Sequence, residues 1–246
     1  MNFFSELGKY LLLMKEVFTK PDKARVFFRQ IFIEFQNLGI DSLGIVIIIS
    51  VFVGAVVAIQ TAYNIDSPLI PLSMVGFTTR QSIILEFSPT MISLVLAGKV
   101  GSRIASEIGT MRVTEQIDAL EIMGINPANY LIQPKVVAAV IINPVLIIFS
   151  MAFALFGGWL ACVITGMVTS TDYITGLQGW FDGYTVFYAL IKTSVFAFII
   201  TSVAGYQGYQ TRGGALEVGT ASTKAVVHSC ILIIIFNLIL TQLLLV

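Results

Sequence analysis

Two charged residues stand inside long apolar stretches of this sequence, Glu86 and Lys192. An ionisable side chain at bilayer depth costs at least about 2.5 kcal/mol, so it usually faces a partner or a water-filled cavity. Counted inward from the ends of their stretches, the two residues lie at similar depth, so they could form a pair. The chemistry they offer is binding: they can hold a polar group within a membrane. The alternatives are a purely structural ion pair or a lysine whose ammonium reaches outward to the interface.

The sequence argues against several kinds of catalytic chemistry. Its single histidine, His228, and two separated cysteines fall short of the three or four ligands of a zinc or iron site, and His228 is better explained as a hydrogen-bonded structural residue. Neither a Gly-x-x-x-x-Gly-Lys-Ser/Thr phosphate loop nor a Gly-x-Ser-x-Gly motif occurs. The net charge of zero does not suggest a nucleic-acid partner. We therefore predict no catalytic residues, no metal and no cofactor, and expect that any ATP hydrolysis belongs to another subunit.

A second candidate site is the polar stretch at about residues 107–123. Val113, Ile117 and Leu120 have the spacing of one helical face, and Gly124 with Pro127 supplies a stop. This pattern predicts a compact amphipathic helix, which either docks into a groove of a partner or lies on the membrane with its charges solvated. Its acidic residues are spaced three apart: Glu115, Asp118 and Glu121.

The elements that position these residues must be membrane-spanning helices. Of the 246 residues, 57% are hydrophobic and 11% are charged, whereas a soluble domain has about 25% charged residues. Lipid cannot satisfy open backbone groups, and the pattern of a transmembrane barrel is absent. We predict an all-α polytopic protein with five spans. They cover about Leu43 to Tyr63, Ile83 to Val100, Val136 to Thr169, Tyr184 to Gln207 and Ala225 to Val246.

Two of these spans contain helix-disrupting residues. The third exceeds a hydrocarbon core of roughly 30 Å, so it must tilt, begin in the interface, or kink near Asn143-Pro144 or Gly157-Gly158. Pro89 is expected to kink the second span. Ser50, Gly54 and Ala58 allow close helix contact along the first span, but the sequence does not say whether this stripe faces a second copy of the chain.

The orientation follows from the basic residues, because Lys and Arg near span ends stay on the cytoplasmic side. They gather before the first span and in the connections after the second and fourth, whereas only Arg80 lies between the first two spans. With five spans, the N-terminus is predicted to be cytoplasmic and the C-terminus external. Residues 1–38 form a predicted N-terminal segment along the inner membrane surface or against a cytosolic subunit, and residues 39–246 the membrane domain.

Further motifs carry a resemblance to a known family. They comprise Ala97 to Ser102, Glu107 to Leu120, Asn126-Pro127, Pro134-Lys135, Ile191 to Ser194, Gly213 to Ala215, Val218 to Thr223 and Val226 to Ser229. Over roughly Gly39 to the end, the chain resembles the MlaE/YrbE permeases, which are partners of MCE proteins in lipid-transporting ABC systems. Family members commonly have Arg-Glu-Leu-Gly-Pro where this chain has Leu85-Glu86-Phe87-Ser88-Pro89, so Glu86 and Pro89 match but the preceding base is missing. Arg80, in the neighbouring turns, is a candidate substitute for that base.

The resemblance implies a non-catalytic permease of the bacterial inner membrane that helps to maintain outer-membrane lipid asymmetry. It would work as a homodimer that moves phospholipid, with two copies of a cytosolic ABC ATPase and an external ring of MCE domains. The runner-up is a membrane-embedded lipid-modifying enzyme. The residues expected to couple to the ATPase are Glu107, Arg112, Glu115, Gln116, Asp118 and Glu121, and those expected to bind lipid are Glu86, Leu85, Gln60 and Lys192.

Overall fold

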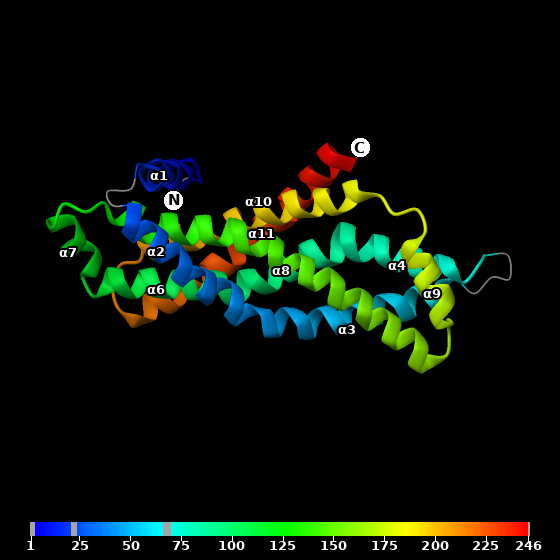
Figure 1. Ribbon diagram of the computed structural model, residues 1–246. Helices are drawn as coiled ribbons and strands as arrows, with labels where there is room; N and C mark the ends of the chain where they lie inside the picture. Colours follow the sequence, from blue (N-terminus) through cyan, green and yellow to red (C-terminus); the bar gives the residue numbers. More distant parts are fainter. Residues whose placement is uncertain (1–2, 21–23, 66–69, 246) are drawn as a thin grey trace.

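A computed structural model describes residues 3–20, 24–65 and 70–245 of the chain as helices joined by short turns, with no strand among them. The all-α prediction is confirmed. Five continuous helical segments of the described part are long and apolar enough to cross a membrane: Ala24–Asn64, Ser73–Val113, Pro127–Thr165, Gly183–Tyr209 and Ala215–Leu245. They run side by side along the molecule, with α7 at one end and α9 at the other (Figure 1).

The helical elements follow one another in a simple order. Three of them, η1, η2 and η3, are π-helical turns within longer helices. The bounds are α1 Phe3–Val17, α2 Ala24–Glu34, η1 Phe35–Ile40, α3 Asp41–Asn64, α4 Ser73–Ser82, η2 Ile83–Met91, α5 Ile92–Leu96, η3 Ala97–Gly101, α6 Ser102–Val113, α7 Gln116–Ile122, α8 Pro127–Thr165, α9 Ser170–Gln178, α10 Gly183–Tyr209 and α11 Ala215–Leu245.

Four of the predicted spans lie within a helix that is longer at one or both ends. The third span begins earlier than expected, at Pro127, and its helix ends at Thr165, four residues before the expected Thr169. The fifth begins ten residues earlier than expected, at Ala215, and its expected last residue, Val246, lies outside the described residues. The first begins at Ala24, because α2, η1 and α3 are continuous. The expected division after residue 38 falls within this continuous segment and stays a prediction. A prediction based on apolar length alone does not include these extensions, because they lie outside the apolar centre and their polar residues pack on neighbouring helices.

Helix α1 packs against α8 and α10 through one face. Leu13, Met14 and Val17 are buried there. The side-chain amide of Asn129 on α8 donates to the carbonyl oxygen of Val17 at 2.9 Å, which closes the end of α1. A hydrogen bond from Tyr206 lowers the pKa of Glu6 at the other end of α1. The opposite face is also apolar and exposed, as expected for a helix at an interface; it carries Phe4, Leu7, Leu11 and Leu12.

Helix α8 is the longest element and remains helical throughout its 39 residues. At 1.5 Å per residue it is about 58 Å long, and neither Asn143-Pro144 nor Gly157-Gly158 interrupts it. It begins where the sequence indicates, since Pro127 occupies the first turn and the side chain of Asn126 accepts a hydrogen bond from the backbone of Asn129. The structure therefore argues against a break in the helix, and its length calls for a tilt or a start in the interface.

Close backbone contact joins α3 to α8. A Cβ atom on Gly54 would clash with the backbone carbonyl of Ala154, and one on Gly157 would clash with the backbone of Val51. Small residues let membrane helices approach in this way. Ser50 adds a hydrogen bond to Ser150 at 2.8 Å. The stripe of Ser50, Gly54 and Ala58 thus packs within the chain, which answers the question that the sequence left open.

This contact predicts a selective effect of adding one methyl group. Gly54→Ala should destabilise the protein by about 1–3 kcal/mol, because α3 and α8 must separate to make room. Gly44→Ala, on the same helix but with open space around the new Cβ, should be neutral or slightly stabilising. Thermal unfolding of the two variants in detergent measures the difference, and equal midpoints would contradict the packing argument.

Candidate functional site

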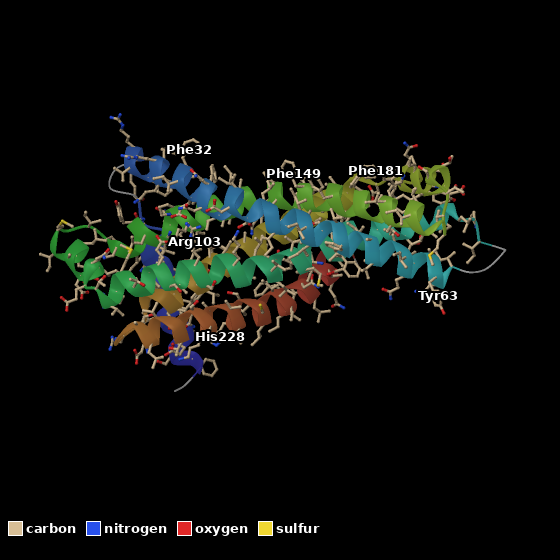
Figure 2. All side chains as sticks on the ribbon, turned by 90° about the horizontal axis from the view of Figure 1, so that it is seen from below. Phe32, Tyr63, Arg103, Phe149, Phe181 and His228 are labelled. Atoms are coloured by element: carbon tan, nitrogen blue, oxygen red, sulfur yellow. The ribbon has the colours of Figure 1, made fainter. Side chains whose placement is uncertain are left out.

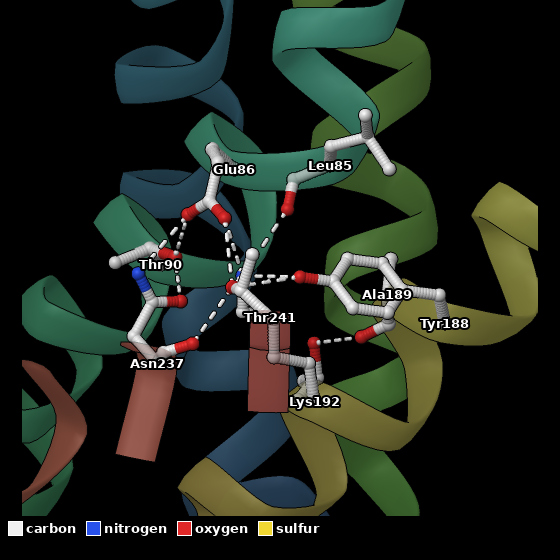
Figure 3. Close-up of polar contacts among 9 residues, drawn as sticks. Leu85, Glu86, Thr90, Tyr188, Ala189, Lys192, Asn237 and Thr241 are labelled. Carbon is white, nitrogen blue, oxygen red and sulfur yellow. Dashed lines mark hydrogen bonds and ion pairs between the residues drawn. The ribbon is translucent and has the colours of Figure 1, made fainter. Parts of the chain in front are cut away.

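The fold brings Glu86 of η2 and Lys192 of α10 together inside the membrane-spanning part of the bundle. Their side chains form an ion pair with 2.6 Å between Nζ and Oε1 (Figure 3). The pairing suggested by their similar depth is confirmed. It links two helices whose contacting residues are 106 positions apart in the chain.

The ammonium of Lys192 is fully enclosed. Its side chain is 0% exposed, and it donates to the hydroxyl oxygens of Tyr188 at 2.8 Å and Thr241 at 3.2 Å. The carbonyl oxygen of Leu85 lies at 3.4 Å. Tyr188 stands one turn away on the same helix, and its ring centroid lies 5.0 Å from the ammonium. Every proton of the ammonium therefore has an acceptor within the protein.

The carboxylate of Glu86 is more open, with 41% of its side chain exposed. The amide of Asn237 donates to Oε2 at 3.1 Å, and the hydroxyls of Thr90 and Thr241 lie at 3.1 and 3.3 Å from the two carboxylate oxygens. Asn237 and Thr241 are one turn apart on α11, so this network ties η2 to both α10 and α11. Sequence reasoning missed these two residues, although polar residues four apart in an apolar run were an available signal.

The π-helical geometry of η2 helps to place Glu86. Pro89 lies within this turn and cannot donate a backbone hydrogen bond. A π-helical turn accommodates that loss and is frequently found at functional sites. The kink expected at Pro89 thus takes the form of a change in helix type between residues 83 and 91.

The side chains of the other two lipid-binding candidates take no part in this network. Leu85 contributes only its carbonyl oxygen, and Gln60 is exposed on α3 without a described contact to Glu86 or Lys192. Close to Glu86 the structure adds a buried chain of hydroxyls that the sequence did not suggest. Ser150 of α8 donates to Ser88 of η2 at 3.1 Å and accepts from Ser50 of α3.

Arg80 cannot replace the base missing at position 85. Its side chain is 3% exposed, and its guanidinium donates to the carbonyl oxygens of Gly179 at 2.9 Å and Trp180 at 3.2 Å, and also to that of Leu177. Phe77 and Phe181 place their rings beside it. The arginine thus closes the C-terminal end of α9, and the idea that it meets a lipid phosphate is wrong.

The stretch at residues 107–123 is not one helix. Helix α6 ends at Val113, Glu115 adopts a left-handed backbone conformation with φ of 59°, and α7 begins at Gln116. The face formed by Val113, Ile117 and Leu120 is therefore interrupted, because the helical spacing does not continue through Glu115. Only Ile117 of these three is fully buried.

Several of the predicted coupling residues hold this α6–α7 turn in place. Arg112 pairs with Asp118 at 2.7 Å across the turn and lies over the ring of Tyr209, whose hydroxyl donates to Glu121 at 3.3 Å. Glu107 accepts from the buried Lys135 at 2.9 Å. Glu115 and Gln116 remain exposed.

In Figure 2, Phe181 and Tyr63 lie toward one end of the bundle, and Arg103 of α6 lies toward the other. His228 projects from α11 and has Gln207 as a hydrogen-bond partner at 3.0 Å, as expected for a structural histidine. Within residues 3–20, 24–65 and 70–245, no three His, Cys, Asp or Glu side chains gather where they could hold a metal ion.

Comparison with known proteins identifies the family. The family model described as "Permease MlaE" matches residues 31–243. The chain belongs to the MlaE permease family. A protein of Rickettsia bellii named "Probable ABC transporter permease protein" is 36% identical over 96% of this chain and 91% of its own length. The "Intermembrane phospholipid transport system permease protein MlaE" of Haemophilus influenzae is 30% identical over 98% of this chain and 92% of its own length.

A plant protein is related over a smaller share of its length. "Protein TRIGALACTOSYLDIACYLGLYCEROL 1, chloroplastic" of Arabidopsis thaliana is 31% identical over 89% of this chain and 63% of its own length. The family assignment makes the chain a membrane permease of the MlaE type.

The ion pair of this MlaE-family permease predicts an unequal effect of removing either partner. Glu86→Ala leaves the enclosed ammonium of Lys192 without its counter-ion and should cost about 3 kcal/mol of stability. Lys192→Met should cost less, because the half-exposed carboxylate can protonate or meet water. The double variant should recover part of the Glu86→Ala loss. Unfolding midpoints in detergent test this order, and a larger loss for Lys192→Met would contradict it.

Proposed function

We propose that the chain is the permease subunit of an ABC-type system that moves phospholipid between a bacterial inner membrane and an external MCE-protein partner. In this proposal two copies of the chain form a homodimer, and two copies of a separate cytosolic ATPase drive it. Phospholipid enters a site around Glu86 and Lys192, with Leu85 and Gln60 on the surrounding surface. The name of the Haemophilus influenzae relative supports the substrate.

The observation that carries this proposal is the charged network at membrane depth. Among the described residues of the outer parts of the five long helices, the charged side chains of Arg80 and Lys192 are buried, whereas Glu86 keeps a carboxylate that is 41% exposed. A charged group in such a place usually marks a substrate path. Lys192 and Asn237 hold the carboxylate in one orientation. A lipid head group that reaches this depth would therefore meet a preorganised polar partner.

The distribution of charge supports an orientation with the α7 end in the cytoplasm. Lys99, Arg103, Arg112 and Lys135 all lie toward that end, whereas Asp172 and Asp182 border the connections at the α9 end. Positive residues are retained on the cytoplasmic side. The N-terminus would then lie in the cytoplasm and the C-terminus outside.

The α6–α7 turn is the proposed contact with the ATPase. Its polar tip at Glu115 and Gln116 is exposed, and beside it Ile122 and Met123 present apolar side chains to solvent. Large exposed apolar residues next to charges are typical of a protein interface. The ion pair of Arg112 with Asp118 fixes the shape of the turn, so force from a bound partner could reach α6.

The runner-up function, a membrane-embedded lipid-modifying enzyme, has less support. His228, the single histidine of the sequence, lies beside Gln207 rather than beside a nucleophile. The buried serine hydroxyls of Ser50, Ser88 and Ser150 hydrogen-bond to one another. Neither arrangement resembles a nucleophile activated by a base.

The decisive test is lipid transfer in proteoliposomes that contain the chain with its ATPase and external partner. We expect ATP-dependent transfer of unmodified phospholipid, and transfer about tenfold slower for Glu86→Gln because a charge-assisted contact is lost. Asp172→Asn, which neutralises a partly exposed carboxylate at the α9 end, is the control and should transfer normally. The chain alone should neither hydrolyse ATP nor alter lipid. Covalent lipid turnover by the isolated chain would support the enzyme instead.

The proposed ATPase contact makes a separate prediction. Glu115→Lys reverses an exposed charge at the tip of the turn without breaking an observed ion pair, so it should reduce co-purification of the ATPase several-fold while membrane insertion is unchanged. Asp118→Lys should have a mixed effect, since it also breaks the pair with Arg112. Asp172→Lys at the opposite end serves as the control. Full retention of the ATPase by Glu115→Lys would rule out this contact.

A further inference from the structure

The charges of the outer part of the bundle bear on which phospholipid the proposed site accepts. This outer part comprises residues 43–65, 70–95, 140–205 and 229–245, which extend from the centres of the long helices to the α9 end. Within it two cations and three carboxylates occur: Arg80 and Lys192, and Glu86, Asp172 and Asp182. A phosphate group would need one of the cations, and an ammonium group would need one of the carboxylates.

Neither cation is available to a ligand. Arg80 is 3% exposed and already donates to backbone carbonyl oxygens at the end of α9. Lys192 is 0% exposed and donates to Glu86, Tyr188 and Thr241, which accounts for its three protons. A lipid phosphate could bind either group only by displacing bonds that satisfy a buried charge, which is costly.

The carboxylate of Glu86, in contrast, has spare acceptor capacity. A carboxylate has about four acceptor positions, and Lys192 and Asn237 occupy one each. The single hydroxyl proton of Thr90 can go to Oδ1 of Asn237 at 3.0 Å. That of Thr241 can go to the backbone oxygen of Asn237 at 2.7 Å, its shortest contact. Exposed carboxylate oxygen can therefore accept a proton from a ligand.

We propose that this site selects phospholipids whose head group carries a primary ammonium, and that Glu86 is the residue that determines this specificity. The inference rests on the proposed function, because it names the lipid class for the same site. The ammonium of phosphatidylethanolamine donates to the exposed face of Glu86, while Lys192 stays on the enclosed face. The charge-assisted bond forms in a low-dielectric region, where it is strong.

The same geometry disfavours other head groups. Phosphatidylglycerol carries a net negative charge and would approach an exposed carboxylate with no free cation nearby, which is repulsive. The quaternary ammonium of phosphatidylcholine keeps its positive charge but has no proton to donate. The expected order of preference is phosphatidylethanolamine, then phosphatidylcholine, then phosphatidylglycerol.

The experiment is lipid competition on the full-length chain. The purified protein is equilibrated with an equimolar mixture of the three lipids, all with the same acyl chains, and the bound lipids are counted by native mass spectrometry. For the wild type we expect phosphatidylethanolamine to exceed phosphatidylglycerol by at least about threefold. Glu86→Gln should bring that ratio close to one. Asp172→Asn, outside the site, should keep the wild-type ratio.

A second variant tests the inference in the opposite direction. Leu85→Arg adds a cation beside Glu86 while Glu86 itself is retained. This variant should shift binding towards phosphatidylglycerol. Equal binding of all three lipids by the wild type, or a preference for phosphatidylglycerol, would overturn the specificity and leave the lipid site intact. A wild-type chain that retains none of the three lipids would instead contradict the proposed function itself.

Discussion

The arrangement of the outer half of the bundle depends on one constraint: the ammonium of Lys192 is fully buried within the membrane-spanning part of the protein. An unpaired charge there is expensive, so three helices converge to supply acceptors. The π-helical turn η2 brings Glu86, α10 brings Tyr188, and α11 brings Thr241. Beyond Ile233, α11 has no fully buried residue among those described. Its outer third is therefore attached mainly through the polar groups of this network and through Tyr184, which bonds to the backbone of Leu244.

Elsewhere in the bundle the helices are held by close approach, because lipid supplies no hydrophobic drive between them. Gly54 and Gly157 let α3 and α8 touch at the backbone, and Gly76 and Gly176 do the same for α4 and α9. This packing leaves little freedom for α3 and α8 to move separately. The polar attachment of α11 differs from this packing in how it responds to movement. Dispersion contacts between backbones weaken when the helices separate by fractions of an ångström. Hydrogen bonds, in contrast, can exchange partners with water or a lipid head group.

The sequence was sufficient for features that depend on apolar length or on a strong local signal. The centres of all five long helices, the start of α8 at Asn126-Pro127 and the pairing of Glu86 with Lys192 follow from such signals. It was not sufficient where partners come from distant segments. Asn237 and Thr241 gain their meaning only when α11 lies beside η2, and Arg80 looked like a free base because its acceptors are backbone oxygens. The break at Glu115 was missed since a left-handed residue other than glycine has no reliable sequence pattern.

One continuous helical segment, Ser73–Val113, carries both Glu86 and the start of the proposed ATPase contact. From Glu86 to Glu107 is 21 residues, or about 30 Å of helix. A uniform α-helix of that length would transmit a displacement of one end to the other almost rigidly. This segment instead contains two π-helical turns, η2 around Glu86 and η3 at Ala97–Gly101, where the backbone hydrogen-bond register changes. If an ATPase moves the α6–α7 turn, the segment can rotate at η2 and η3 without losing its helical continuity. Of these two turns, η2 contains the carboxylate of the proposed lipid site.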